Sequence, residues 1–226
     1  ALGPNFVGIA AFIGAFAISL AVLFISNLGG RSNSMKLLLA GMALSAVCGA
    51  FSSFIVYFAN NKEGMQTIAY WMMGSLAGAQ WGELMVIAPI IIASVIFFWT
   101  QSRVLNLMLL GDESAITMGT DLHVYRQWYL LISSLIVGFA VYSAGMIGFV
   151  GLIIPHVIRM FTGPDHKRLI PVSALTGAIF LVICDGLCRV IIPHTELPIG
   201  ILISMIGAPC FIYLMIKKTY GFGGND

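Results

Sequence analysis

Long apolar runs separated by short polar turns dominate the chain. The first three runs cover residues 6–26, 37–59 and 84–100. A membrane-spanning helix needs about 17–25 predominantly apolar residues, so each run is long enough to cross a bilayer. The pattern therefore predicts transmembrane helices and not the striped, half-polar helices of a soluble core.

The apolar run from residue 128 to residue 158 is too long for a single span. It is rich in glycine and carries Pro155, residue types that interrupt helices. We predict a break between Gly145 and Gly151, followed by a short second helix through Pro155. The last two predicted spans cover residues 170–192 and 197–216.

The segment YWMMGSLAGAQW, residues 70–81, is too short to cross a membrane. It has Trp near both ends, and Trp and Tyr gather where the membrane meets water. We predict a glycine-broken helix that lies at this interface.

Composition excludes a soluble domain. Only 9% of the 226 residues are charged, against about 25% in soluble proteins, and 59% are hydrophobic. The formal net charge of +2 and the lack of a basic tract exclude nucleic acid as a partner. We predict an all-α fold, a polytopic membrane helical bundle with about seven transmembrane helices. It forms a single domain over residues 1–226, surrounded by membrane lipid.

Basic residues give the orientation, because Lys and Arg in short loops mark the cytoplasmic side. If the run from 128 to 158 crosses twice, only Lys62 and Arg189 of the 11 basic residues lie outside. A single crossing would strand three more basic residues there. The two-crossing arrangement gives seven crossings that begin outside and end inside, an unusual start that predicts a missing amino-terminal piece.

A polar, amphipathic segment at residues 103–124 interrupts the apolar pattern on the predicted cytoplasmic side. Asp112 and Glu113 stand where a helix start favours negative charge, and Gly119 stands where a helix end favours a left-handed residue. The pattern predicts a short, capped surface helix. On the residues alone, this helix is either a solvated loop helix or a docking element for a cytosolic subunit.

Two charged residues fall inside a predicted span. Asp185 and Arg189 are four residues apart and share one helix face. A lone charge in hydrocarbon costs about 2.5–3.5 kcal/mol on insertion scales, so we predict an ion pair near the outer end. On the residues alone, the pair is structural and fixes the position of its helix. Glu196 lies at the same mouth and is equally well explained as a solvated loop carboxylate.

The four cysteines lie in apolar runs without a CxxC pair, so we predict packing residues with no redox role. They are Cys48, Cys184, Cys188 and Cys210. His156 and His194 are each isolated in the sequence. We therefore assign no cofactor and no metal site.

Small residues recur every four positions in two of the predicted spans. They are Gly41, Ser45, Gly49 and Ser53 in the second span, and Gly200, Ser204 and Ala208 in the last. Such stripes normally allow helices to pack closely.

Several long strings resemble the FecCD-type permeases, the membrane subunits of ABC importers for iron-siderophores, haem and cobalamin. They include LNLMLLGDESAITMGTD, AGMIGFVGLIIPHVIRMFTGPDHKRLIPVSALTGA and ELPIGILISMIGAPCFIYLMIKK. The resemblance runs from about Phe6 to Lys218 in the family's order. It implies ten helices, of which this sequence would supply the fourth to the tenth; the family's first three helices, with their arginine-bearing and NPL-type motifs, are absent.

The resemblance also implies partners and roles. The partners are a cytosolic ABC ATPase dimer, an extracytoplasmic substrate-binding protein and a second permease subunit, in a bacterial cytoplasmic (inner) membrane. Residues 103–124 become a cytoplasmic coupling-helix loop, the coupling loop below. Its ATPase-coupling residues are Leu110, Gly111, Asp112, Glu113, Ser114, Ala115, Met118 and Gly119.

Three further sets of residues acquire roles by resemblance. Arg189, with Asp185 and Glu196, would dock the binding protein. Ser34 and Met35, which form an ordinary turn on pattern alone, would lie at the cytoplasmic gate. The two stripes of small residues would line the transport pathway between two subunits.

The function expected from this resemblance is passage of a metal chelate, with an iron-siderophore first and haem or cobalamin next. The sequence holds no GxxxxGK[ST] phosphate loop, so energy has to arrive from partner ATPases, and the subunit itself is non-catalytic. The alternative is a secondary carrier or channel for a small solute, which would use unpaired intramembrane carboxylates. An intramembrane enzyme would need a nucleophile with a base, or an HExxH metal set, and neither appears.

Overall fold

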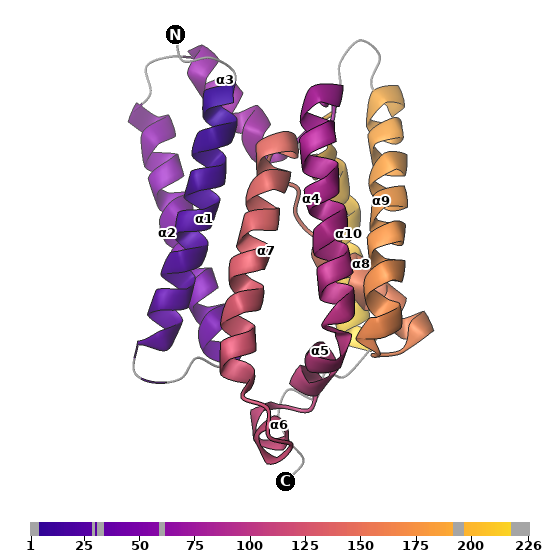
Figure 1. Cartoon of the computed structure of the whole chain (residues 1–226). Coiled ribbons are helices and arrows are strands. Elements are labelled where there is room, and N and C mark those ends of the chain that lie inside the picture. The colour runs from indigo at the N-terminus through magenta and orange to yellow at the C-terminus, as the bar shows by residue number, and fades with distance from the viewer. Residues whose placement is uncertain (1–4, 29, 31–33, 59–61, 192–196, 218–226) are drawn as a thin grey trace.

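The computed structural model of the chain describes residues 5–28, 30, 34–58, 62–191 and 197–217. The described residues form an all-helical bundle (Figure 1). In chain order the helices are α1 (Asn5–Asn27), α2 (Ser34–Phe58), α3 (Lys62–Met73), α4 (Trp81–Thr100), α5 (Ser102–Leu109), α6 (Asp112–Thr117), α7 (Leu122–Ala144), α8 (Val150–Thr162), α9 (His166–Ile191) and α10 (Ile199–Lys217).

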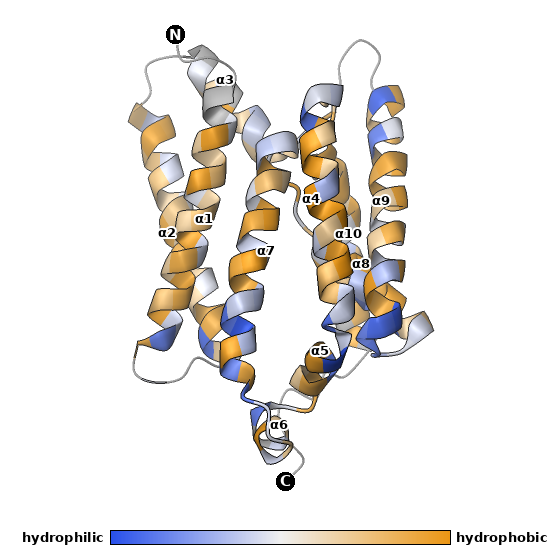
Figure 2. Cartoon of the chain, in the orientation of Figure 1, coloured by the Kyte–Doolittle hydropathy of each residue, from blue (hydrophilic) through white to orange (hydrophobic). Residues whose placement is uncertain are grey.

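The described helices alternate in direction through the bundle. α1, α2, α4, α7 and α9 are long and apolar enough to span a membrane, and α8 and α10 are shorter apolar helices. The chain descends in α1, α4, α8 and α10 and ascends in α2, α7 and α9 (Figure 1). Hydrophilic residues gather at the ends of the bundle and hydrophobic residues lie between them (Figure 2). The predicted fold class is confirmed.

The predicted break in the long apolar run is present. α7 ends at Ala144, and α8 begins at Val150 after a turn that runs back into the bundle (Figure 1). Gly145 has a φ of 68°, and a Cβ there would lie 2.7 Å from the carbonyl oxygen of Trp71. Only glycine fits this turn without displacing the backbone of α3.

The interfacial helix lies earlier in the chain than its sequence predicts. α3 ends at Met73, and residues 74–80 are irregular, so the prediction of a helix over 70–81 is wrong in its extent. Gly74 ends the helix with a φ of 68°. The next backbone N–H, of Ser75, donates to the carbonyl of Ala144 at 2.9 Å. The turn after α7 therefore fixes the end of α3.

Two other predicted boundaries shift by about one helical turn. α2 begins at Ser34, so Ser34 and Met35 belong to its first turn and not to a loop. α4 begins at Trp81, three residues before the predicted span. Polar or aromatic residues at a helix start lie in the membrane interface and extend the helix beyond its apolar run.

Close side-chain packing joins neighbouring helices of the bundle. α1 packs on α7, where Phe12 and Phe139 have ring centroids 4.9 Å apart. A Cβ on Gly138 would come within 2.7 Å of the Phe12 ring, so this small residue lets the two helices approach. Between α9 and α10, the predicted packing role of two cysteines is confirmed. Cys184 and Cys188 share a buried cluster with Ile199 and Ile203.

Candidate functional site

The coupling loop projects from one end of the bundle. α5 follows α4 directly, and α6 lies beyond the ends of the long helices (Figure 1). Two residues of the loop, Ala115 and Leu122, are buried. The loop is therefore a folded element and not an unstructured connection.

Two glycines set the limits of α6. Gly111 precedes it with a φ of 89°, and Gly119 follows it with a φ of 80°. The amide of Gly119 donates to the carbonyl of Ile116 at 2.9 Å, and the amide of Thr120 donates to the carbonyl of Ala115 at 3.0 Å. The predicted stop at Gly119 is therefore a left-handed helix end.

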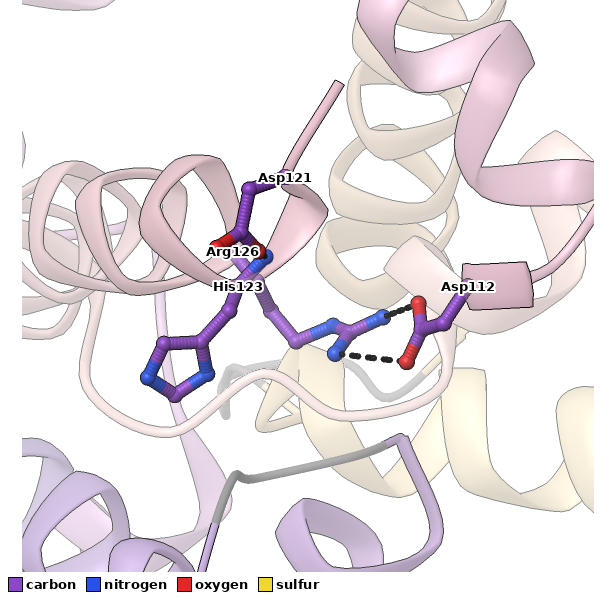
Figure 3. Close-up of polar contacts among 4 residues, drawn as sticks. All are labelled: Asp112, Asp121, His123 and Arg126. Carbon is purple, nitrogen blue, oxygen red and sulfur yellow. Dashed lines mark hydrogen bonds and ion pairs between the residues drawn. The ribbon is translucent and has the colours of Figure 1, made fainter. Parts of the chain in front are cut away.

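An ion pair fixes α6 against the start of α7. The Arg126 guanidinium donates to the two carboxylate oxygens of Asp112 at 2.6 and 3.4 Å (Figure 3). The Arg126 side chain is 12% exposed and that of Asp112 is 45% exposed. Asp112 therefore holds the loop together, in addition to standing at a helix start.

The first turn of α7 carries its own cap. The Asp121 carboxylate accepts a hydrogen bond from the backbone N–H of His123 at 3.0 Å. Asp121 and His123 lie beside the Arg126–Asp112 pair (Figure 3). The loop thus re-enters the bundle at a fixed point.

Exposed apolar side chains cover the outer surface of the loop. Ile116 is 57% exposed and Met118 is 60% exposed, and Leu109 and Leu110 are exposed as well. These residues lie at an end of the bundle where hydrophilic residues gather (Figure 2). Contact with lipid tails does not explain an apolar patch there, whereas contact with a protein does. The Glu113 side chain lies outside the described part of the structure.

Two hydrogen bonds brace the base of the loop. The Tyr129 hydroxyl of α7 donates to Gln101 Oε1 at 3.0 Å, at the junction of α4 and α5. The Trp99 indole N–H donates to the carbonyl of Lys167 at 2.9 Å, which joins α4 to α9. These partners are 28 and 68 residues apart, so no local sequence pattern indicates them.

At the opposite end of the bundle, the predicted pair is present. Arg189 donates from Nε to Asp185 Oδ2 at 2.8 Å, and the Arg189 side chain is about half exposed. Glu196 lies outside the described residues. The Arg189 guanidinium is therefore partly exposed near the end of α9, and Asp185 on the same helix balances its charge.

The small residues of α2 line hollows. One hollow of about 610 Å³ includes Gly41 and Ser45, and another of about 510 Å³ includes Ser53. A Cβ added at Gly41 or Gly49 would meet no atom within 4 Å. Within the described chain, these glycines therefore serve no close helix contact.

The stripe on α10 has a different environment. Gly200 lies against the backbone carbonyl of Met73 and therefore serves close packing. Gly207, which is not part of the stripe, packs closely against Ile153 and Phe149. Gly200 and Ser204 also line a hollow of about 660 Å³ with Met72 of α3. Met72 lines the hollow beside Ser53 as well, so α3 connects the surfaces of α2 and α10.

The two residues predicted at the gate lie at the end of the bundle that carries the coupling loop. Ser34 and Met35 are exposed in the first turn of α2, and α2 starts at the end of the bundle from which α6 projects (Figure 1). Among the described residues, no group of three or more His, Cys, Asp or Glu side chains is placed to hold a metal ion.

The chain is similar in sequence and in fold to known proteins. Residues 1–217 match the model of the FecCD transport family. The chain is 40% identical over 218 residues to the hemin transport system permease protein of Yersinia pestis, covering 96% of this chain and 64% of that protein. It is 39% identical over 206 residues to the cobalamin import system permease protein of Halobacterium salinarum, covering 91% of this chain and 55% of that protein. The chain thus spans 55–64% of the length of these two relatives.

A solved structure has the same helical arrangement. It is described as an inward-facing conformation of a metal-chelate type ABC transporter, and it matches with a TM-score of 0.80 at 31% identity. The match covers 93% of this chain and 71% of that chain. Sequence and fold agree that the chain belongs to the FecCD transport family.

Proposed function

We propose that the chain forms the pathway-bearing part of a permease subunit of an ABC importer in a bacterial cytoplasmic membrane. The family match and the relatives named as hemin and cobalamin permeases support this proposal. The subunit is a conduit, and cytosolic ATPases supply the energy. An extracytoplasmic binding protein delivers the cargo.

The observation that carries the proposal is the apolar surface of the coupling loop. Ile116 and Met118 lie exposed at α6. The Arg126–Asp112 pair holds this helix against α7, and glycines with positive φ delimit it at both ends. A folded, exposed apolar surface of this kind suits a groove on a cytosolic partner. Docking removes its apolar side chains from water, and the loop loses little conformational freedom because it is already folded. We assign the ATPase dimer to this surface.

The opposite face of the bundle suits the binding protein. Arg189 is about half exposed near the end of α9, and Asp185 orients its guanidinium. An acidic residue on the binding protein would complete a charge-assisted contact there. Glu196 belongs to the same proposed surface on sequence grounds.

The transport pathway lies along α2 and α10 in this proposal, and a second permease subunit closes it. The hollows beside Gly41, Ser45, Gly200 and Ser204 are lined by uncharged side chains. Such walls hold a bulky cargo weakly and let it pass. Ser34 and Met35 stand at the cytoplasmic end of this wall and form the gate.

The cargo we propose is a metal chelate. The relatives named for hemin and cobalamin favour a metal tetrapyrrole over the iron-siderophore that the sequence resemblance suggested first. Uptake of labelled haem, cobalamin and a ferric siderophore into vesicles would rank the three directly.

Replacing Met118 tests the docking assignment. In the complete importer, Met118→Glu places a charge on this apolar surface. We expect the amount of ATPase that co-purifies to fall at least about tenfold, because one apolar contact of roughly 1.5 kcal/mol is lost. Met118→Leu is the matched control because it keeps the apolar surface. Normal co-purification and normal ATP-driven uptake with Met118→Glu would refute the assignment.

The same vesicles separate the importer from a secondary carrier. An importer loses uptake when the partner ATPase cannot hydrolyse ATP and is indifferent to a protonophore. A carrier shows the opposite response.

A further inference from the structure

Side chains from α5 and from the turn before α9 meet at the cytoplasmic end of the bundle. Asn106 Nδ2 donates to Asp165 Oδ1 at 2.8 Å. Asn106 Oδ1 accepts from the backbone N–H of His166 at 2.9 Å and lies 2.7 Å from His166 Nδ1. We name Asn106, Asp165 and His166 the Asn106 cluster.

The chemistry of the partners fixes the protons in this cluster. Hydrogen bonds from Asn106 and then from the Lys167 N–H lower the pKa of the Asp165 carboxyl, so it is ionised at neutral pH. A carboxylate only accepts, so the atom of Asn106 that faces it is the amide nitrogen. The amide oxygen then faces His166, whose Nδ1 carries the proton and donates. Asn106 therefore satisfies one acceptor and two donors at once.

The cluster is tied to the start of α9 by its neighbours. Asp165 Oδ1 also accepts from the backbone N–H of Lys167 at 3.0 Å, which caps the first turn of α9. The carbonyl of the same Lys167 accepts from the Trp99 indole. α4 and α5 are therefore both bonded to one turn of α9.

α9 is in turn packed against the helices that follow and precede it. Leu169, near its start, shares a buried cluster with Ile154 and Ile158 of α8. Cys188, near its end, shares a buried cluster with Ile199 of α10. A displacement of the first turn of α9 therefore reaches α8 and α10, the latter carrying the proposed pathway residues Gly200 and Ser204.

We propose that Asn106 is the positioning residue through which movement of the coupling loop is transmitted to α9 and so to the pathway. This inference rests on the proposed function, because it assigns a route to the movement that ATPase docking would start. α5 lies between α4 and α6, and its Asn106 side chain is hydrogen-bonded to Asp165 and His166 at the start of α9. Without these bonds α5 loses this direct link to α9, while the Trp99–Lys167 bond from α4 remains.

Asn106→Asp tests the route with little change of shape. It replaces the donor facing Asp165 by a carboxylate oxygen, which removes the bond and adds like-charge repulsion. In the importer reconstituted with its ATPases and binding protein, we expect transport per ATP hydrolysed to fall about tenfold, the factor that loss of a charge-assisted hydrogen bond implies. ATPase co-purification and basal hydrolysis should be unchanged. The double variant Asn106→Asp with Asp165→Asn exchanges amide and carboxylate and should restore part of the coupling.

A distance measurement tests the proposal without altering the cluster. Spin labels at Arg103 of α5 and Arg168 of α9, both exposed, report the separation of the two helices. In the labelled protein with an intact Asn106 cluster, this separation should be the same in the nucleotide-free and the ATP-bound importer. With Asn106→Asp it should change on ATP binding.

Two outcomes would overturn the proposal. The first is normal transport per ATP in Asn106→Asp, and the second is a change of the 103–168 separation in the protein with the intact cluster. Either result leaves the docking assignment standing if the ATPases still co-purify. Loss of ATPase binding to the unaltered chain would instead refute the proposed function itself.

Discussion

Arg126 and Asp112 determine how α6 is held. The guanidinium is mostly withdrawn from water, and its partner carboxylate is about half exposed. A mostly buried cation that loses its partner pays a desolvation cost that the pair avoids. The ion pair therefore holds α6, at the tip of the coupling loop, in place against α7.

Removal of the Asp112 charge should loosen α6. With Asp112→Asn we expect a loss of roughly 1–2 kcal/mol in the local stability of the loop, which corresponds to amide exchange about 5–30-fold faster in α6. Hydrogen–deuterium exchange on the detergent-solubilised protein measures this. Asp121→Asn is the control, because an amide oxygen still caps α7. An unchanged rate of amide exchange in α6 would show that the Arg126–Asp112 pair does not stabilise this helix.

Sequence reasoning reached some of these residues and missed others for a physical reason. The helix stop at Gly119 and the pair of Asp185 with Arg189 follow from local rules on φ and on i,i+4 spacing. Arg126 meets Asp112 from 14 residues away, and Asn106 meets Asp165 from 59 residues away. Contacts at such separations depend on tertiary packing, which periodicity does not report.

At the scale of elements, the same distinction holds. The break after α7 was predictable, because glycines, a proline and the placement of basic residues all indicated it. The end of α3 was not, because the turn after α7 fixes it: the amide of Met146 donates to the carbonyl of Trp71 at 3.2 Å. Three backbone segments meet there, at Gly74, Gly145 and Gly200.

This three-way junction should not tolerate a side chain on α10. Gly200→Ala would drive a Cβ into the backbone carbonyl of Met73, which cannot rotate away as a side chain could. We expect a loss of about 1–3 kcal/mol, seen as a lower thermal midpoint in detergent.

Gly186→Ala on α9 is the control, because a Cβ there meets no atom within 4 Å. Equal thermal midpoints for Gly200→Ala and Gly186→Ala would show that a side chain at position 200 is tolerated.

At the scale of the whole molecule, the two polar ends of the bundle differ. One end carries the folded coupling loop with its exposed Ile116 and Met118, and the other carries the Asp185–Arg189 pair. In the proposed importer these ends receive different partners, a motor inside and a delivery protein outside. The Asn106 cluster then connects the inner end to α9, which runs the length of the bundle to the outer pair.

Photo-crosslinking from position 118 tests whether the coupling loop docks a cytosolic ATPase. A photoreactive amino acid replaces Met118 in the assembled importer, and one replaces the exposed Val182 of α9 in a control. We expect position 118 to capture the cytosolic ATPase, whereas position 182, in the membrane-spanning part, should not. Failure of position 118 to capture the ATPase, or labelling of that position only by reagents on the outer side of the membrane, would show that the coupling loop is not the ATPase docking site.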